Sequence, residues 1–173
     1  MKPNPVRAGL PRLAVALLLA ASGLVTTDSV HAQNGPAETS PQVWLNAGTY
    51  SHHFNRDKNF RENNTGFGAE VWLSDDHALM AGTFMNSDDE RSRYAAYQWR
   101  PFHWQPAGIR IGAGISLGAF DGYPRYRNGG WFPSALPALS IEYKMVGINL
   151  FLVPTIPDRI DGAISLQLKL RVW

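Results

Sequence analysis

Within the stretch AISLQLKLRVW, residues 163–173, apolar and polar residues alternate without a break from Ile164 to Val172. Leucines and other apolar residues occupy one face, and Ser165, Gln167, Lys169 and Arg171 occupy the other. A period of two is typical of a β-strand with two different faces. Such a strand fits a soluble barrel or sandwich with its apolar face inward, or a membrane barrel with its apolar face outward, and periodicity alone does not decide between them.

Both ends of the chain favour the membrane. A chain that ends on an aromatic residue of an alternating strand, as at Trp173, resembles the C-terminal signal of outer-membrane barrels. At the other end, Lys2, Arg7 and Arg12 accompany an apolar run at 13–25 that is too short to span a bilayer. We therefore expect a signal peptide at 1–32, cleaved after Ala32, and export through the periplasm to the outer membrane.

Loss of that segment would remove three of the sixteen basic residues and one of the fourteen acidic ones, which leaves thirteen of each. A neutral chain offers no basic surface for a nucleic acid, so we expect no nucleic-acid partner. After the signal there is no apolar stretch of membrane-helix length, which excludes a helical membrane protein. With no cysteine, the fold must form without disulfides.

Turn residues divide the rest of the chain into a short polar tail at 33–41 and eight strand-sized segments within 42–173. The predicted fold is all-β, an eight-stranded antiparallel transmembrane β-barrel of the outer membrane. The intervening connections alternate between longer ones, predicted outside the cell, and shorter ones on the periplasmic side. The expected strands are 42–54, 65–75, 77–86, 91–100, 107–119, 132–143, 146–154 and 162–173.

Three sequence features bear on the barrel wall and interior. Small residues on one face of the fifth segment, Gly112, Gly114 and Gly118 among them, would leave room inside the barrel. Prolines cannot donate to a strand ladder, so Pro133, Pro137 and Pro154 should open the wall locally and give a lipid tail sideways access. Aromatic residues near strand ends suit interfacial girdles, namely Trp44, Trp99, Phe102, Trp104, Trp131 and Trp173.

Polar groups gather at the outer ends of the first and third predicted strands. His52, His53 and Asp57 lie in the first group, and Asn86, Ser87 and Asp88 lie in the second. These ends lie about 10 Å apart in an antiparallel meander, so a histidine could act as general base for the serine hydroxyl.

The two adjacent histidines point to opposite faces of their strand, so we expect no metal site. Strict alternation places His52 inside the barrel, whereas a bulge near the strand end would place His53 there.

Several short motifs spread over most of 42–173 resemble the lipid A palmitoyltransferases of the PagP type, and specifically their divergent members. They include Ser51-His52-His53-Phe54, Phe84-Met85-Asn86-Ser87, Tyr94-Ala95-Ala96-Tyr97-Gln98-Trp99 and Leu136-Pro137-Ala138-Leu139. The resemblance implies transfer of a palmitoyl chain from a glycerophospholipid to lipid A of lipopolysaccharide, without a cofactor, by a monomeric barrel that holds the acyl chain.

Within this resemblance, the family's catalytic histidine corresponds to His53 and its serine to Ser87. Asn86 stands where better-studied members have Asp, so a carboxylate, if one is needed, must come from Asp57 or Asp88. Gln98 stands roughly where a glycine sets the acyl-chain length in the family, which indicates a different donor chain. Two alternatives remain open: a non-catalytic structural or adhesive barrel, and a lipid A deacylase or phospholipase that uses water as acceptor.

Overall fold

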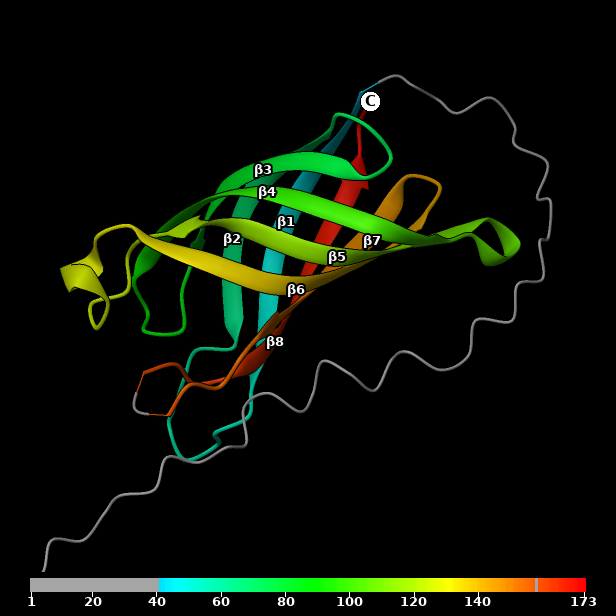
Figure 1. The fold of residues 1–173 in the computed structure, drawn as a ribbon. Helices are drawn as coiled ribbons and strands as arrows, with labels where there is room; N and C mark the ends of the chain where they lie inside the picture. Colours follow the sequence, from blue (N-terminus) through cyan, green and yellow to red (C-terminus); the bar gives the residue numbers. More distant parts are fainter. Residues whose placement is uncertain (1–40, 158) are drawn as a thin grey trace, which may run out of the picture. The chain divides into compact units, whose positions relative to one another are not determined.

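The computed structural model describes residues 41–157 and 159–173; the predicted signal peptide and nearly all of the polar tail lie outside the described residues. Eight antiparallel strands pair in chain order, and β1 pairs with β8, so the sheet closes into a barrel (Figure 1). The predicted fold class is confirmed. The strands are β1 (Gln42–His53), β2 (Asn63–Trp72), β3 (His77–Met85), β4 (Arg91–Trp104), β5 (Ile109–Phe120), β6 (Phe132–Tyr143), β7 (Val146–Val153) and β8 (Ala163–Arg171).

The fourth strand differs most from its prediction. A turn was predicted at 101–106, but β4 continues through Pro101 to Trp104. Its pairing with β5 shifts register between Trp99 and Phe102, which is a β-bulge. A bulge is one of the few places where a strand accepts proline. The turn itself follows, in a short 3₁₀ segment, η1 (Pro106–Gly108).

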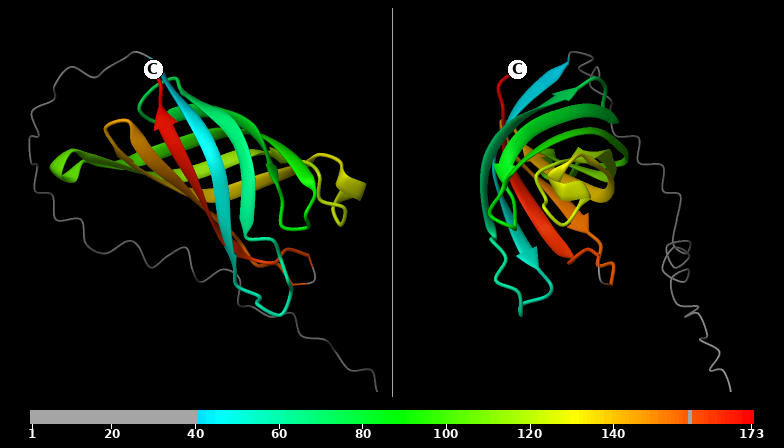
Figure 2. Two further views of the ribbon diagram at one scale, coloured as in Figure 1. Left: turned by 180° about the vertical axis from the view of Figure 1, so that it is seen from behind. Right: turned by 90° about the vertical axis from the view of Figure 1, so that its left-hand side faces the viewer.

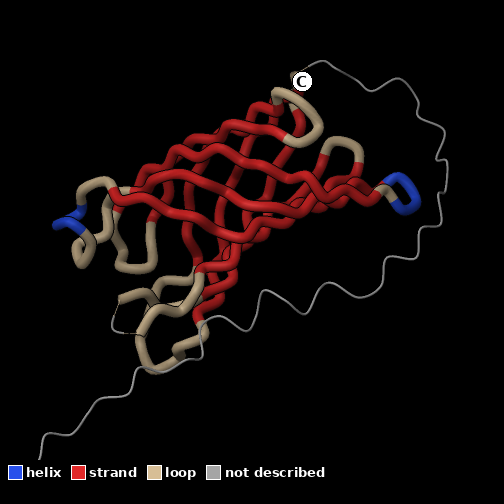
Figure 3. The backbone as a smooth tube through the Cα atoms, viewed as in Figure 1, coloured by secondary structure: helices blue, strands red, loops and turns tan. Residues whose placement is uncertain are grey.

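The two ends of the barrel differ in their connections (Figure 3). One end carries the segments 54–62, 86–90, 121–131 and 154–162, and we call it the long-loop end. The opposite, short-turn end carries 73–76, 105–108 and 144–145. The loop with the second 3₁₀ segment, η2 (Arg127–Gly129), lies in front of the barrel mouth when the long-loop end faces the viewer (Figure 2).

The strands place apolar side chains outside and polar side chains inside. In β8, Leu168 is 56% exposed while its neighbour Lys169 is 4% exposed. This is the reverse of a soluble barrel and the pattern of a membrane barrel. Most of the predicted girdle aromatics are exposed, but Trp44 is buried inside the barrel, where the Lys169 Nζ lies 4.6 Å from its ring centroid. Among the described residues, no helix has the length and apolarity needed to cross a membrane.

A bulge in β1 exchanges its two faces part-way along the strand. The pairing of β1 with both β2 and β8 shifts between Ala47 and Thr49. Gly48 lies there with φ +61°, a left-handed conformation that glycine adopts without steric cost. Trp44 and Asn46 are buried before the bulge, whereas Ser51 and His53 are buried after it.

Charged and amide side chains fill the interior toward the short-turn end. The Lys169 ammonium donates to Glu70 at 2.9 Å and to Glu142 at 2.6 Å, and the Arg100 guanidinium lies 3.6 Å from Glu70. Asn149 donates to Glu70 at 2.7 Å. Two cations and two carboxylates balance in charge, which buried ionic groups require. We call these five residues, together with Gln98, the polar plug.

We expect Leu168→Arg to lower the free energy of unfolding in lipid vesicles by about 2–4 kcal/mol, because it places a cation at mid-strand on the lipid face. The control is Val172→Arg, which lies beyond the end of β8 and should cost about 0–1 kcal/mol. Tryptophan fluorescence during urea titration measures both. Equal, near-zero costs would contradict the orientation of the barrel in the membrane.

Candidate active site

A cavity of about 590 Å³ occupies the interior toward the long-loop end. Its wall is largely apolar and aromatic, with Phe84, Phe120, Phe132 and Phe151 among its lining residues. Ser51, His53, Ser87, Asp88, Arg125, Tyr126, Arg159 and Asp161 are among its polar lining residues. Small-molecule sites typically measure about 300–1,000 Å³ and combine an apolar wall with a few polar groups.

The floor of the cavity rests on the polar plug. Met80, Tyr94 and Gln167 line the cavity, and the Gln167 amide donates to the Tyr94 hydroxyl at 3.2 Å. Beneath them, Gln98 is fully buried, and its amide contacts the sulfur of Met80. Gln98 also accepts a hydrogen bond from Arg100. The depth of the cavity is therefore set where the apolar wall meets these hydrogen-bonded groups.

His53 points into this cavity from the last position of β1. Its side chain is 6% exposed and packs on the Phe60 ring, with centroids 4.6 Å apart. Its Nδ1 atom is buried without a hydrogen-bond partner among the described residues. Burial beside an apolar cavity with one unpaired ring nitrogen suits an imidazole that exchanges a proton with a bound molecule.

His52 points the other way. Its side chain is 57% exposed, and its Nδ1 lies 3.9 Å from the Glu62 carboxylate on the barrel exterior. The expectation from strict alternation, that His52 faces the interior, is therefore wrong. The cause is the bulge at Gly48, which lies four residues before His52 and five before His53. The inward orientation of His53 agrees with the family motif, in which His53 corresponds to the catalytic histidine.

The loop 86–90 brings Ser87 and Asp88 to the cavity mouth. The Ser87 carbonyl accepts a hydrogen bond from the Arg61 backbone N–H at 3.1 Å, which ties this loop to the one that follows β1. Within the described part of the chain, no hydrogen bond joins the His53 imidazole to the Ser87 hydroxyl. Catalytic hydrogen bonds are often long in unliganded sites and shorten when substrate binds.

Asn86 organises the Ser87 loop from a fully buried position. Its amide nitrogen donates to the Ser92 hydroxyl at 3.0 Å and to the Gly122 carbonyl at 2.8 Å. Its oxygen accepts from the backbone N–H groups of Asp88 at 2.8 Å and Glu90 at 3.0 Å. With all these contacts made, Asn86 acts as a scaffold for Ser87 rather than as a free acid or base.

The two carboxylates predicted to substitute for an acid at position 86 lie in different surroundings. Asp57 is exposed, and its backbone N–H donates to the Asn55 side chain. Asp88 lines the cavity, and its carboxylate lies 3.8 Å from the Arg125 guanidinium. The structure therefore brings Asp88, but not Asp57, together with His53 and Ser87.

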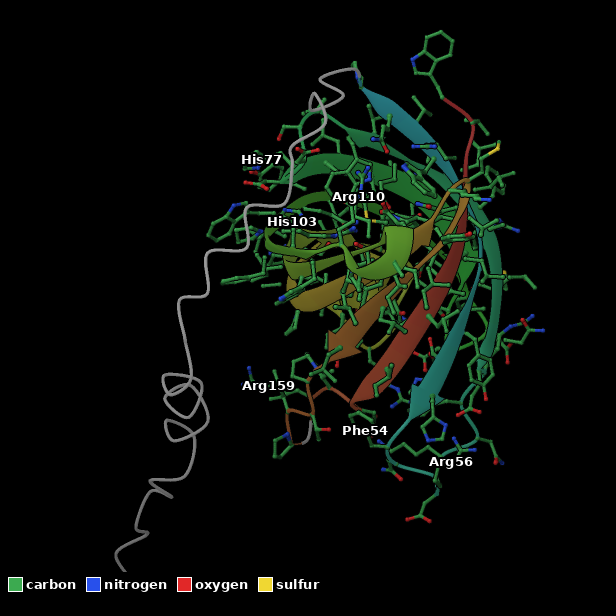
Figure 4. The ribbon with its side chains drawn as sticks, turned by 90° about the vertical axis from the view of Figure 1, so that its right-hand side faces the viewer. Phe54, Arg56, His77, His103, Arg110 and Arg159 are labelled. Atoms are coloured by element: carbon green, nitrogen blue, oxygen red, sulfur yellow. The ribbon has the colours of Figure 1, made fainter. Side chains whose placement is uncertain are left out.

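Sequence reasoning missed Phe60, Arg125 and Asp161, which line the cavity from three different loops. Hydrogen bonds from Lys58 to Asp161, at 3.0 and 2.9 Å, lower the pKa of that carboxyl and keep it ionised. No short motif marks these residues, because they meet only through the folding of loops that are far apart in the sequence. Phe54 and Arg159 both lie at this end in Figure 4, and the Phe54 N–H donates to the Gly162 carbonyl at 2.9 Å.

A second ion pair orders the loop 54–62 on the barrel exterior. The Arg56 guanidinium donates to Glu62, and this contact lowers the pKa of Glu62 to about 2. The Glu62 carboxylate also accepts from the Tyr50 hydroxyl at 3.1 Å. The Glu62 carboxyl is therefore ionised throughout the physiological pH range.

The pairing of β6 with β7 is incomplete toward the long-loop end. Their pairing runs from Tyr143 with Val146 to Ala138 with Phe151 and ends there, so residues 132–137 have no partner on β7. Pro133 and Pro137 lie in this stretch, and Pro154 directly follows β7. None of the three has an N–H to donate to a ladder. Pro133, Leu136 and Pro154, which lie in or next to this unpaired stretch, line the cavity.

The three inward glycines of β5 lie at two levels. Gly118 pairs with Ala96 and Ser134, which line the cavity. A Cβ at Gly112 would lie 3.0 Å from the Ser140 hydroxyl and 3.5 Å from the Arg100 side chain, at the level of the polar plug. Gly114 packs against the backbone of Trp99 and Arg100. In the described part of the chain, no group of three or more His, Asp or Glu residues could hold a metal ion.

Comparison with known proteins identifies the family of this chain. The family described as "Antimicrobial peptide resistance and lipid A acylation protein PagP" matches residues 33–167. This chain belongs to the PagP family. The resemblance seen in the short motifs is thereby confirmed, and PagP family members are outer-membrane β-barrel proteins.

Among individual relatives, the chain is 31% identical over 124 residues to the Lipid A acyltransferase PagP of Laribacter hongkongensis (strain HLHK9). The match covers 65% of this chain and 58% of that protein. Among solved structures, the de novo designed protein TMB2.3, determined by solution NMR, matches with a TM-score of 0.45 and 15% identity, over 82% of this chain and 98% of the designed one.

We expect Asn86→Asp to destabilise the barrel by about 1–3 kcal/mol, because a carboxylate cannot donate to the Gly122 carbonyl and its charge is buried. Asn63→Asp makes the same chemical change on an exposed side chain and should be near neutral. Urea unfolding in vesicles measures both. Equal stability of the two variants would contradict the scaffold role of Asn86.

Proposed function

We propose that this protein transfers an acyl chain, palmitoyl or similar, from a glycerophospholipid to lipid A in the outer membrane. The observation that carries the proposal is the cavity itself: an apolar chamber with His53 and Ser87 at its polar mouth and a sideways opening between β6 and β7. Membership of a family described by lipid A acylation, and likeness to a relative named Lipid A acyltransferase, support the same reaction.

The proposed chemistry uses His53 as the base and Ser87 as the nucleophile. His53 takes the Ser87 proton, and the serine oxygen attacks the ester carbonyl carbon of the donor. The bond from that carbon to the glycerol oxygen breaks, and His53 passes its proton to this oxygen, which releases lysophospholipid. His53 then takes a proton from a lipid A hydroxyl, whose oxygen attacks the acyl-serine ester. The Ser87 oxygen leaves and regains a proton.

The donor chain would lie in the cavity with its methyl end on the floor. Gln98 supports Met80 from below, so we propose that Gln98 limits the depth available to the chain. Gly118 lies beside the chain, whereas Gly112 and Gly114 border the polar plug and would affect chain length only indirectly. We propose that the donor enters through the opening bounded by Pro133, Pro137 and Pro154, since a chain can pass there without breaking paired backbone groups.

The proposed acyl transfer in the outer membrane also bears on the export of the protein, its assembly and the roles of its carboxylates. We propose export through the periplasm after cleavage of the predicted signal peptide, and action as a monomer without cofactor, metal or nucleic acid. Asp88 is the carboxylate best placed to steady a charged His53 or Arg125 at the mouth, since it lines the cavity with both. Asp57 is exposed in the loop 54–62, so we propose no direct part for its carboxylate in the reaction.

The test is transfer of a labelled acyl chain from phospholipid to lipid A by purified protein in detergent. We expect His53→Ala and Ser87→Ala each to reduce the rate by about 100- to 10,000-fold, the usual contribution of a positioned base and its partner. His52→Ala is the matched control, and its rate should stay near that of the parent because this side chain faces outward.

Heat-modifiable migration on gels verifies that each variant has assembled. Full activity of an assembled His53→Ala or Ser87→Ala variant would contradict the mechanism. Release of free fatty acid in place of acylated lipid A would instead identify a hydrolase, and absence of both products would identify a non-catalytic barrel.

A further inference from the structure

A second cavity, of about 360 Å³, adjoins the first at the long-loop end. Four residues line both cavities: Phe60, Ser87, Asp88 and Arg125. Ser87, the proposed nucleophile, therefore lies at the junction of two chambers. Lys58, Asn59, Asp89 and Pro124 complete the lining of the second one.

The second cavity differs from the first in its chemistry. Apart from Phe60 and Pro124, its lining residues are polar or charged. Both of its cations lie near the Phe60 ring, Lys58 at 5.8 Å and Arg125 at 5.9 Å from the centroid. An aromatic ring with cations and carboxylates around it suits a polar, hydroxyl-bearing ligand that also carries negative charge.

The side chains of Lys58 and Arg125 both have hydrogen-bond donors left for a ligand. The Arg125 side chain is 60% exposed, and its contact with Asp88, at 3.8 Å, is longer than a hydrogen bond. The Lys58 side chain is 46% exposed beside Asp161, and an ammonium has three donors. Phosphate is the anion that Arg and Lys bind most readily in such a position.

The location separates this cavity from the entry route of the donor. Its lining comes from the loops 54–62, 86–90 and 121–131. The loop 121–131 leads into β6, but Pro133, Leu136 and Pro154, which border the proposed wall opening, line only the first cavity. A donor that enters through the wall and fills the first cavity leaves the second one free, so a second substrate can reach Ser87 from its other side.

We propose that the second cavity binds the phosphate-bearing sugar head of the acyl acceptor, with Lys58 and Arg125 on a phosphate and Phe60 beneath the sugar. The proposal rests on the proposed acyl transfer and adds the place where the acceptor binds. It also explains how a transferase would exclude water, because the head group would occupy the space from which water could attack the acyl-serine ester.

The experiment compares lipid A that carries both phosphates with the same lipid A after mild-acid removal of one. Binding of each in micelles without donor, and KM and kcat for transfer from a labelled diacyl phospholipid, are measured for the full-length protein. The variants are Lys58→Gln and Arg125→Gln. Arg127→Gln is the control, since it removes a cation from the same loop as Arg125 but its guanidinium donates to the Trp131 carbonyl, away from the cavity.

We expect each cavity variant to weaken binding of bisphosphorylated lipid A and to raise its KM by about tenfold, with kcat changed much less. The preference for the bisphosphorylated form should shrink in both variants and persist in Arg127→Gln. Unchanged binding and KM for lipid A in both cavity variants would overturn the proposal. So would a KM change confined to the phospholipid, which would assign the cations to the donor phosphate instead.

The experiment distinguishes failure of the proposed acyl transfer from failure of the proposed acceptor site. Wild-type protein that binds both lipid A forms but transfers nothing would refute acyl transfer, and the binding comparison would still judge the cavity on its own.

Discussion

Backbone hydrogen bonding in lipid is the constraint on which the rest of this structure depends. No water is available inside a bilayer to pair with exposed N–H and C=O groups, so a strand that crosses it must have neighbours on both sides. Pairing of β1 with β8 meets this requirement by closing the sheet. The pairing of β6 with β7 ends at Ala138 and Phe151, and two of the six residues beyond it on β6, Pro133 and Pro137, have no N–H to leave unpaired. This unpaired stretch supports the proposal that a lipid chain enters the barrel here, because its passage would break no β6–β7 hydrogen bonds.

Closure also divides the interior into two functional layers. Toward the short turns, Lys169 and Arg100 pair with Glu70 and Glu142 and fill the barrel with balanced charge. Toward the long loops, aromatic side chains leave a cavity instead. The plug supplies the floor, while β1 brings His53 and the loop 86–90 brings Ser87 to the mouth. In the proposed reaction, an acyl chain held between them would present its ester at the mouth and its methyl end at the floor.

Sequence periodicity predicted the strands, because apolar and polar residues alternate along segments such as β8, and the two ends of the chain favoured a membrane barrel with its polar face inside. Neither feature could show the bulges. One inserted residue at Gly48 turns His53 inward, and the bulge beside Pro101 carries β4 beyond its predicted end. The His53 and Ser87 pair was reachable from the sequence because both lie at strand ends next to short motifs. Phe60, Arg125 and Asp161 were not, since three separate loops bring them together.

The central claim is that this barrel adds an acyl chain to lipid A, and the mass spectrum of lipid A tests it most directly. Outer membranes are compared from cells that produce the full-length protein and from cells that lack it. The account predicts a new lipid A species heavier by one acyl chain, palmitoyl or of similar length, only when the protein is present. Identical spectra, or a species lighter by one acyl chain, would contradict it.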